Sequence, residues 1–192
     1  MEFAEKIEQL LEEHQTSFIQ AQTGLGKTYG YLLPALNLES QVGILVSVPT
    51  KILQNQIMQE EGQRLKEVFH LEIHSLKGPQ NYLKLDAFHR VLHRSESNRL
   101  FTRFKMQLLI WLTESETGDL DEIGQLYRYQ HFLPELVHDG KLSKKSLFAT
   151  EDFWKRGQEK AKTSRVLLTN HAYLVTRLED NPEFVDNRLL IL

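Results

Sequence analysis

The amino-acid sequence predicts an α/β fold with a parallel sheet, and three features of the sequence support this prediction. Residues 42–48 form a nearly continuous apolar run, which is typical of a strand buried on both faces of a parallel sheet. Residues 71–76 and 165–169 have the composition of further strands, and helical patterns lie between the strands. Strands that alternate with helices require right-handed crossovers, which place helices on both faces of the sheet.

Two more strands are predicted at the ends of this pattern. Residues 16–20 are a short strand candidate that precedes a glycine-rich turn. Residues 188–192 form an apolar strand with no turn, cap or polar terminus after it. Because a domain seldom ends within a buried strand, we expect this chain to be a truncated part of a larger domain.

Apolar spacing and capping residues predict the helices. Pro34 is expected to kink or end the helix that starts at Lys27, because proline lacks the backbone N–H that a helix interior needs. Thr50 follows Pro49 and can cap the next helix. Apolar residues at helical spacing mark the first helix and the one after Thr50: Phe3, Ile7, Leu10 and Leu11, then Ile52, Leu53 and Ile57.

The composition excludes several classes of protein and site. The chain has 192 residues, a formal net charge of −3 and 41% hydrophobic residues, which suits one domain or one domain with an insertion. It contains no cysteine, so disulfides, iron–sulfur clusters and a cysteine nucleophile are excluded. The longest apolar run, residues 108–112, cannot span a membrane, and residues 1–6 do not begin a signal peptide. We expect a cytoplasmic protein with no membrane partner.

The secondary-structure pattern of the sequence changes twice along the chain. Residues 1–83 alternate helical patterns with short β-branched runs. Residues 84–162 read as helical and charged, with almost no strand signal. Residues 163–192 again alternate helical patterns with strand-like runs, so we predict a sheet domain that is interrupted by a mainly helical insertion.

A glycine-rich turn joins the strand predicted at 16–20 to the following helix. Gly24 and Gly26 allow the backbone to curl around a phosphate, and the helix adds the positive end of its dipole. Lys27 would reach the β- and γ-phosphates, and the Thr28 hydroxyl would bind Mg²⁺. We therefore predict an ATP–Mg site with Lys27 and Thr28 as its catalytic residues. The residues predicted to bind the nucleotide are Ala21, Gln22, Thr23, Gly24, Leu25, Gly26, Lys27 and Thr28.

Two other interpretations of this loop stay open at this point. The general pattern has glycine at the position of Ala21, so a chance turn in a surface loop is one alternative. A small-molecule kinase is the other, and it would need an arginine-bearing lid and an acceptor pocket. The strand–loop–helix context favours the phosphate-binding interpretation.

The loop and three further segments resemble one helicase family. Residues 21–28 have the Ala-x-Thr-Gly-x-Gly-Lys-Thr form of superfamily 2 helicases. Residues 46–56, with the run Val-Pro-Thr-Lys, resemble helicase motif Ia, which contacts the backbone of single-stranded DNA. Residues 76–83 resemble the Lys-Gly-x-x-Asn-Tyr-Leu-Cys segment of the XPD/DinG helicases, and residues 167–174 resemble their Thr-Asn-His-x-x-Leu segment. The segments occur in family order and cover nearly the whole chain.

The resemblance implies a RecA-like first motor domain that uses ATP and Mg²⁺ to move 5′ to 3′ on single-stranded DNA. It also implies a second motor domain in the same protein. By this resemblance, the residues that would contact DNA are Thr50, Lys51, Gln54, Asn81, Tyr82, Asn170 and His171.

The sequence departs from the family pattern at two places. Lys84 stands where the family has the first cysteine of an iron–sulfur cluster, so the resemblance is to the cluster-free, DinG-like bacterial branch, some members of which carry a fused exonuclease domain. Because that cluster domain helps to separate strands, a nucleotide-gated single-strand binding module that serves a nuclease is an alternative function. The family's Asp-Glu-Ala-His motif would follow Leu192, so we expect this fragment alone not to turn over ATP at a useful rate.

The predicted insertion contains two basic stretches with interleaved aromatic residues. They form a channel for DNA phosphates and bases in one interpretation, and solvated helices with aromatic core residues in the other. Arg90 and Arg94, and likewise Arg99 and Arg103, are spaced to share a helix face. The basic residues are Lys84, Arg90, Arg94, Arg99, Arg103 and Lys105, then Lys141, Lys144, Lys145, Lys155, Arg156, Lys160, Lys162 and Arg165; the aromatic residues are Phe88, Phe101, Phe104, Trp111, Phe148, Phe153 and Trp154.

The remaining histidine and acidic residues are interpreted as structural and not as metal ligands. His89 and His93, like His70 and His74, are four apart but lack a third ligand in the sequence. The acidic residues between 114 and 122 are interpreted as an exposed loop: Glu114, Glu116, Asp119, Asp121 and Glu122.

Overall fold

The structure is a computed structural model, and it describes residues 2–13, 16–22, 26–37, 42–95, 97–141 and 146–192. The chain divides into two units: residues 1–76 together with 163–192 form the sheet unit, and residues 77–162 form the helical unit. The helical unit therefore lies in the sequence between two parts of the sheet unit. Each unit is described by itself below.

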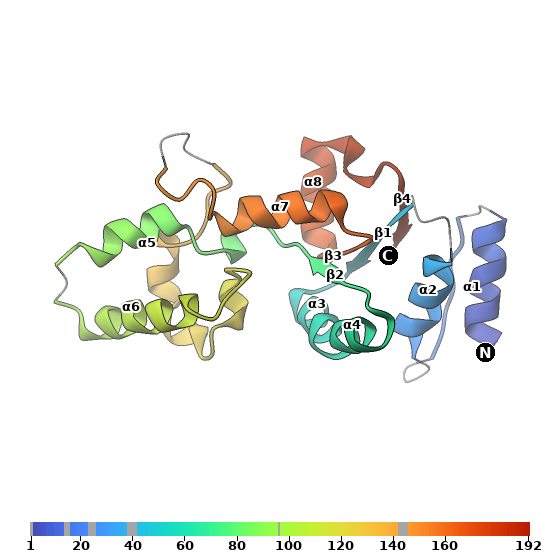
Figure 1. Cartoon of the computed structure of the whole chain (residues 1–192), viewed down its shortest axis with the longest axis horizontal. Helices are drawn as coiled ribbons and strands as arrows, with labels where there is room; N and C mark the ends of the chain where they lie inside the picture. The colour runs from blue at the N-terminus through green and yellow to red at the C-terminus, as the bar shows by residue number, and fades with distance from the viewer. Residues whose placement is uncertain (1, 14–15, 23–25, 38–41, 96, 142–145) are drawn as a thin grey trace. The chain divides into compact units, whose positions relative to one another are not determined.

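The sheet unit contains four strands, all parallel (Figure 1). The order across the sheet is β2, β3, β1, β4, and Val46 of β1 lies opposite Leu168 of β3 and Ile191 of β4. The parallel α/β fold predicted from the sequence is confirmed. The strands are β1 (Gly43–Val48), β2 (Ile73–Ser75), β3 (Val166–Asn170) and β4 (Arg188–Ile191).

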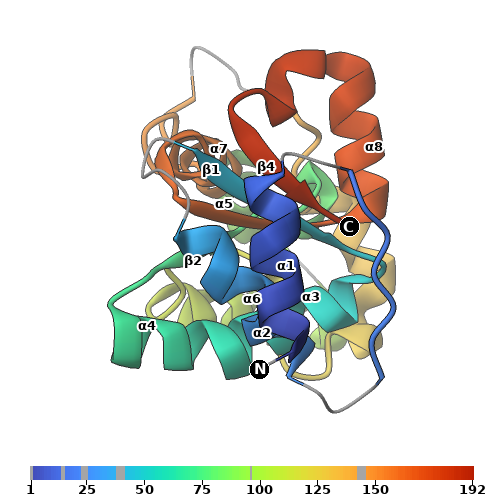
Figure 2. The same ribbon diagram turned by 90° about the vertical axis from the view of Figure 1, so that its right-hand side faces the viewer.

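Helices cover both faces of this sheet, as the crossover argument predicted (Figures 1 and 2). One face of the sheet packs its core residues against Leu32 of α2, Ile57 of α3 and Leu65 of α4. The helix α8 lies on the opposite side. The helices of this unit are α1 (Glu2–Glu12), α2 (Lys27–Leu36), α3 (Lys51–Ile57), the π-helix η1 (Met58–Gly62), α4 (Gln63–Phe69), α8 (His171–Asp180) and the 3₁₀-helix η5 (Pro182–Val185).

The first two helices approach each other closely because of a glycine. A Cβ atom at Gly30 of α2 would lie 2.5 Å from Cδ1 of Phe3, so only glycine allows the phenyl ring to take this position. Pro34 lies inside α2, which ends two residues later at Leu36, in agreement with the predicted end.

The predicted strand at residues 16–20 is wrong. Residues 16–22 have no regular secondary structure, and Phe18 is fully exposed. The physical reason is that this segment gains no hydrogen-bonded partner: β4, at the edge of the sheet, pairs with β1 alone among the described strands. A local sequence pattern indicates that a segment can be extended, but a ladder partner is what makes it a strand.

The helical unit contains only isolated β-bridges, which Tyr82 forms with Asp119 and Leu83 with Val137, among its described residues. Its core includes two stacked ring pairs, Phe101 with Phe132 and Phe104 with Tyr129, each with ring centroids 4.3 Å apart. Its elements are η2 (Pro79–Asn81), α5 (Leu85–Leu92), α6 (Arg99–Leu112), η3 (Leu120–Glu122), η4 (Leu126–Glu135) and most of α7 (Phe153–Thr163).

In the part of the chain that the structure describes, every helix is too short or too polar to cross a membrane.

Candidate functional site

Two helices begin where neighbouring parallel strands end. α3 follows β1, and the Thr50 hydroxyl accepts a hydrogen bond from Leu53 N at 3.2 Å. α8 follows β3, and Asn170 Oδ1 accepts from Tyr173 N at 3.0 Å. The cap by Thr50 was predicted and is confirmed. Because β1 and β3 are adjacent and parallel, the two helix starts meet at the carboxyl edge of the sheet.

The side chain of Gln54 joins the residues at this edge. It is fully buried, and its amide nitrogen donates to Ser75 Oγ at 2.9 Å and to the carbonyl oxygens of Leu76 and Leu168 at 3.1 and 3.2 Å. Its amide oxygen accepts from Asn170 Nδ2 at 3.0 Å. One side chain thus links α3 to the ends of β2 and β3. The polar groups of the predicted site residues Gln54 and Asn170 are hydrogen-bonded to each other, to Ser75 and to the backbone.

His171 is also held at this edge. Its Nδ1 shares a hydrogen bond of 2.8 Å with the hydroxyl of Ser47, which is buried next to the end of β1. The imidazole itself is partly exposed. Thr50 and Lys51 are exposed at the start of α3. Of the predicted contact residues, these three therefore present surface to solvent.

The described part of the phosphate-loop motif leads into α2. Thr23, Gly24 and Leu25 lie outside the described residues. Gly26 precedes the helix with φ 66° and ψ 39°, a left-handed conformation that favours glycine. Ala21 and Gln22 have no regular secondary structure, Lys27 is exposed, and its Nζ lies 3.4 Å from the carbonyl oxygen of Ala21.

The charges at the start of α2 fit a polyphosphate. The first turn contains Lys27 and no acidic residue, so the helix dipole and the ammonium group have the same sign. Thr28, which would hold Mg²⁺, is partly buried and hydrogen-bonds Tyr31. Burial raises the pKa of Tyr31, and the nearby Glu61 carboxylate raises it further, against the effect of the Thr28 bond. The tyrosine therefore stays neutral and adds no negative charge beside the motif.

Asn81 and Tyr82, both predicted to contact DNA, are buried in the helical unit. The Asn81 amide donates to the carbonyl oxygen of Gly78 at 2.9 Å, and the Tyr82 hydroxyl accepts from Lys77 N at 3.1 Å. In this structure the two side chains fix the turn that starts the helical unit.

Lys77 is a residue that the sequence analysis missed. It is 1% exposed, and its Nζ lies 2.5 Å from Asp119 Oδ2 and 2.9 Å from Asp121 Oδ2. Burial raises the pKa of Asp119, while the charge and hydrogen bond of Lys77 lower it. Asp121 is exposed, as the loop interpretation predicted, and Asp119 is partly buried; both also neutralise a buried ammonium group, which was not predicted. The signal available in the sequence was a lysine that directly follows an apolar strand.

A second buried polar pair was also missed. Nδ1 of His138 accepts from Gly140 N at 2.8 Å, so the ring proton lies on Nε2, which is 3.2 Å from Asp152 Oδ2. Burial acts to raise the pKa of Asp152, but the adjacent His138 ring, the hydrogen bond from Lys155 N and the charge of Lys84 lower it overall. The pair lies beside the ring of Trp154, whose centroid is 5.0 Å from that of His138.

The two histidine pairs noted in the sequence differ in the structure. His89 and His93 bring their Nε2 atoms within 3.2 Å at the end of α5, whereas α4 ends at Phe69, so His70 and His74 do not share a helix. Within the described residues, no cluster of three or more His, Cys, Asp or Glu side chains could hold a metal ion.

Three residues of the first basic stretch already have partners inside the helical unit. Lys84 pairs with Asp139 at 2.6 Å, and Arg94 pairs with Glu135 at 3.0 Å. Lys105 is buried, and its Nζ donates to backbone carbonyl oxygens. The prediction that Arg90 and Arg94 share a helix face is wrong, because α5 ends at Leu92.

Most of the interleaved aromatic residues are in the core. Five are buried, which supports the structural interpretation for them, while Trp111 and Phe148 are partly exposed. The buried rings are Phe88, Phe101, Phe104, Phe153 and Trp154. Of the second basic stretch, Lys144 and Lys145 lie outside the described residues.

Comparison with known families agrees with this architecture. The family model for the DEAD/DEAH box helicases matches residues 4–122, more than half of the chain. The chain belongs to the DEAD/DEAH box helicase family. The matched range includes the phosphate-loop motif, Thr50, Lys51 and Gln54 of the carboxyl edge, and α5 and α6 of the helical unit.

Curated relatives place this helicase-family chain in the predicted DinG-like branch. It is 31% identical over 183 residues to a "3'-5' exonuclease DinG" of Staphylococcus saprophyticus, and 33% identical over 165 residues to the protein of that name from Bacillus subtilis. The alignments cover 91% and 83% of this chain, but only 19% and 18% of those relatives. A Staphylococcus aureus protein of the same name is 30% identical over 90% of the chain and 19% of its own length. The chain thus spans about a fifth of the length of these relatives.

Proposed function

We propose that this chain is part of the first motor domain of an ATP-dependent DNA helicase or translocase. It would bind ATP–Mg through residues 21–28 and single-stranded DNA through the carboxyl edge of the sheet and the helical unit. The observation that carries the proposal is the Gln54–Asn170 hydrogen bond, which unites the starts of α3 and α8 at the end of the sheet where ligands bind in open α/β folds.

The nucleotide-binding part of this proposal depends on the start of α2. Lys27 would neutralise the β- and γ-phosphates, and the Thr28 hydroxyl would hold Mg²⁺. The left-handed Gly26 and the absence of acidic residues from the first turn of α2 support it. The bound metal would supply charge stabilisation at the phosphates. Groups elsewhere in the longer protein, including a second motor domain, would complete the hydrolytic site.

The DNA-binding part assigns different tasks to the predicted contact residues. Thr50, Lys51 and His171 would contact the strand, because they are the ones with exposed surface. The buried members of the set, Gln54, Asn81, Tyr82 and Asn170, would hold those contacts in place from within.

The test is a substitution in the full-length protein. Lys27→Ala should reduce ATP hydrolysis by at least about a hundredfold while DNA binding stays nearly unchanged, because the lysine stabilises transferring phosphate. Lys6→Ala, at an exposed lysine of α1, is the matched control and should hydrolyse ATP at the parent rate. Hydrolysis that survives Lys27→Ala at the parent rate would remove the site assignment.

A nucleotide-gated single-strand binding module that no longer unwinds, linked to a nuclease, is the second candidate function. Two observations favour it: the chain has no cysteine for the cluster, and the relatives' names describe an exonuclease. Strand displacement by the full-length protein, measured with and without ATP, separates the two candidates. ATP-dependent displacement supports the helicase, and its absence despite ATP hydrolysis supports the binding module. The kinase alternative is set aside, since the chain belongs to a helicase family.

A further inference from the structure

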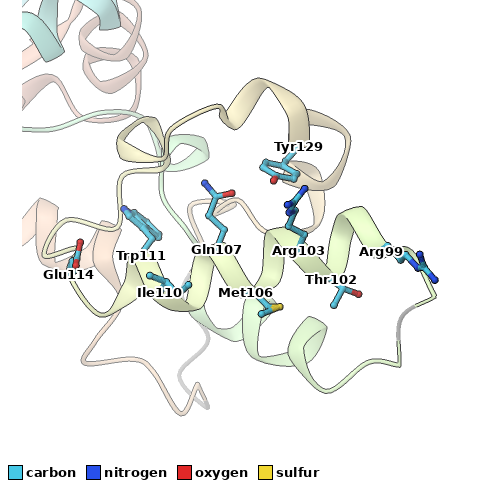
Figure 3. A pocket seen from close by; sticks show the side chains of 9 residues that line it. All are labelled: Arg99, Thr102, Arg103, Met106, Gln107, Ile110, Trp111, Glu114 and Tyr129. Carbon is cyan, nitrogen blue, oxygen red and sulfur yellow. The ribbon is translucent and has the colours of Figure 1, made fainter.

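A groove with a volume of about 670 Å³ runs along one side of α6 in the helical unit (Figure 3). Its walls combine arginine, aromatic, aliphatic and polar side chains, and Glu114 places one carboxylate just beyond Trp111. Two of the aliphatic ones, Met106 and Ile110, are 59% and 67% exposed. The lining residues used below are Arg99, Arg103, Gln107, Trp111 and Tyr129.

Four of these residues form a row along the helix. Arg99, Arg103, Gln107 and Trp111 are spaced four apart, so they follow one another on the same face of α6. In Figure 3, Arg103 and Gln107 point to the side on which Tyr129 lies, and Trp111 ends the row. Phe101, Phe104 and Leu108 fix α6 in the core, and Trp111 at the end of the row packs against the same core, while Arg99 and Arg103 are exposed.

The polar groups of this row leave binding capacity unused. Neither Arg99 nor Arg103 forms an ion pair with any residue that the structure describes, in contrast to Lys84 and Arg94 of the same unit. The Gln107 amide nitrogen donates to the carbonyl oxygen of Gly124 at 3.2 Å, which fixes the side chain and leaves its oxygen as an acceptor. Trp111 packs against the core and is partly exposed, so the row offers two cationic forks, one fixed acceptor and the exposed part of one indole ring.

We infer that this row binds single-stranded nucleic acid, with Arg99 and Arg103 on phosphates and a base stacked on Trp111. The inference rests on the proposed function and names one contact path within it. Unpaired guanidinium groups along the same helix as a partly exposed indole suit a nucleotide strand, because each nucleotide supplies one anion and one π-face. Base stacking does not depend on base identity, so binding through this row is insensitive to sequence.

A protein segment fits the groove less well. An apolar helix would cover Met106 and Ile110, but it would leave the two arginines unpaired or require acidic residues at one end only. A nucleic-acid strand satisfies the charges and the aromatic ring together. The family to which α6 belongs by sequence acts on nucleic acids, which favours the same occupant.

The decisive measurement uses the two tryptophans of the chain, Trp111 and Trp154. Trp154 is buried, and its Nε1 has no hydrogen-bond partner among the described residues, so Trp154→Phe removes its emission without breaking a bond. In that background, adding an oligothymidylate without nucleotide should quench Trp111 emission saturably. The chain with Trp111→Phe, which retains Trp154, should show no such quenching.

Affinity and its salt dependence test the two arginines. Arg99→Gln combined with Arg103→Gln should lower the slope of log affinity against log salt by about 1.4, since each phosphate contact to a single strand contributes about 0.7. Arg90→Gln is the matched control, because it removes an exposed charge of the same unit outside the groove. Trp111→Ala should weaken binding about five- to a hundredfold. Trp111→Phe, which preserves the packing, should lose less.

Three results would overturn the inference. One is oligothymidylate binding that neither quenches Trp111 nor responds to the double arginine variant, which would move the contact path elsewhere while leaving the proposed function intact. Another is unchanged Trp111 emission at every oligonucleotide concentration. The third is self-association that Met106→Glu abolishes, without quenching by oligonucleotide, which would assign the groove to a protein. Failure of the proposed function itself would be seen separately, as ATP hydrolysis that survives Lys27→Ala.

Discussion

Gln54 and Asn170 lie 116 positions apart in the chain, and their side-chain amides meet in a buried hydrogen bond of 3.0 Å. Each amide also holds a structural element: Gln54 binds backbone carbonyls at the ends of β2 and β3, and Asn170 caps α8. The geometry of the carboxyl edge thus depends on a pair of residues that solvent does not reach.

Gln54→Leu should lower the free energy of unfolding by about 2–4 kcal/mol, because it leaves several buried polar groups without a partner. Chemical denaturation of the chain measures this. Gln56→Ala, at an exposed position of the same helix, should change stability by less than about 0.5 kcal/mol. Equal effects of the two substitutions would contradict the buried network.

Ser47 and His171 should show energetic coupling. Each single substitution to alanine leaves the other polar group unpaired, so the double variant should be less destabilised than the sum of the singles, by about 1 kcal/mol. A double-mutant cycle by urea denaturation gives the coupling energy. Strict additivity would show that the 2.8 Å contact contributes nothing in solution.

Lys77→Ala should be among the most destabilising changes in the helical unit, at about 3–5 kcal/mol, since it leaves two carboxylates facing a vacated buried site. Asp119→Asn combined with Asp121→Asn in the Lys77→Met background should recover much of that loss, because the whole charged group is then replaced. Thermal unfolding monitored by circular dichroism ranks the variants. A Lys77→Ala chain as stable as the parent would refute the buried ion pair.

The Asp152 pair predicts a pH dependence of stability. The pKa of Asp152 is lower in the folded chain than its ordinary value of 3.8, so its contribution is present above about pH 4 and is lost as the pH falls through the folded pKa. Asp152→Asn should therefore cost about 1–2 kcal/mol at pH 5.5 and markedly less near pH 2.5. Urea denaturation at both values checks this, with Glu159→Gln, at an exposed position of α7, the helix that follows Asp152, as the control.

The sequence predicted best those features that depend on local chemistry. The apolar run at 42–48 is typical of a strand inside a parallel sheet, and Thr50 has a side chain suited to cap a helix, so β1 and the cap of α3 were found. What depends on distant partners was missed. The sequence around Lys77 does not indicate that Asp119 is its partner. Residues 16–20 have the pattern of a strand, but in the described part of the chain they have no neighbouring strand to pair with.

For the site, too, local features were predicted better than those that depend on distant partners. Motifs identified which residues gather at the carboxyl edge, but burial divides them into exposed and internal groups. The spacing of Arg90 and Arg94 suggested one helix face, whereas the helix end at Leu92 and the ion pair with Glu135 take Arg94 away from it. A helix boundary is set by tertiary packing, which spacing alone does not contain.

The strands that flank the helical unit in the sequence, β2 and β3, are immediate neighbours in the sheet, and Leu76 N donates to Leu168 O at 3.0 Å. A connection between adjacent parallel strands needs only about a dozen residues, usually a helix, and α7 already has that length. Everything between Lys77 and the start of α7 is therefore free to lengthen, shrink or be exchanged over evolutionary time without a change in strand order. Such a junction is modular: the inserted segment can differ while the sheet stays the same.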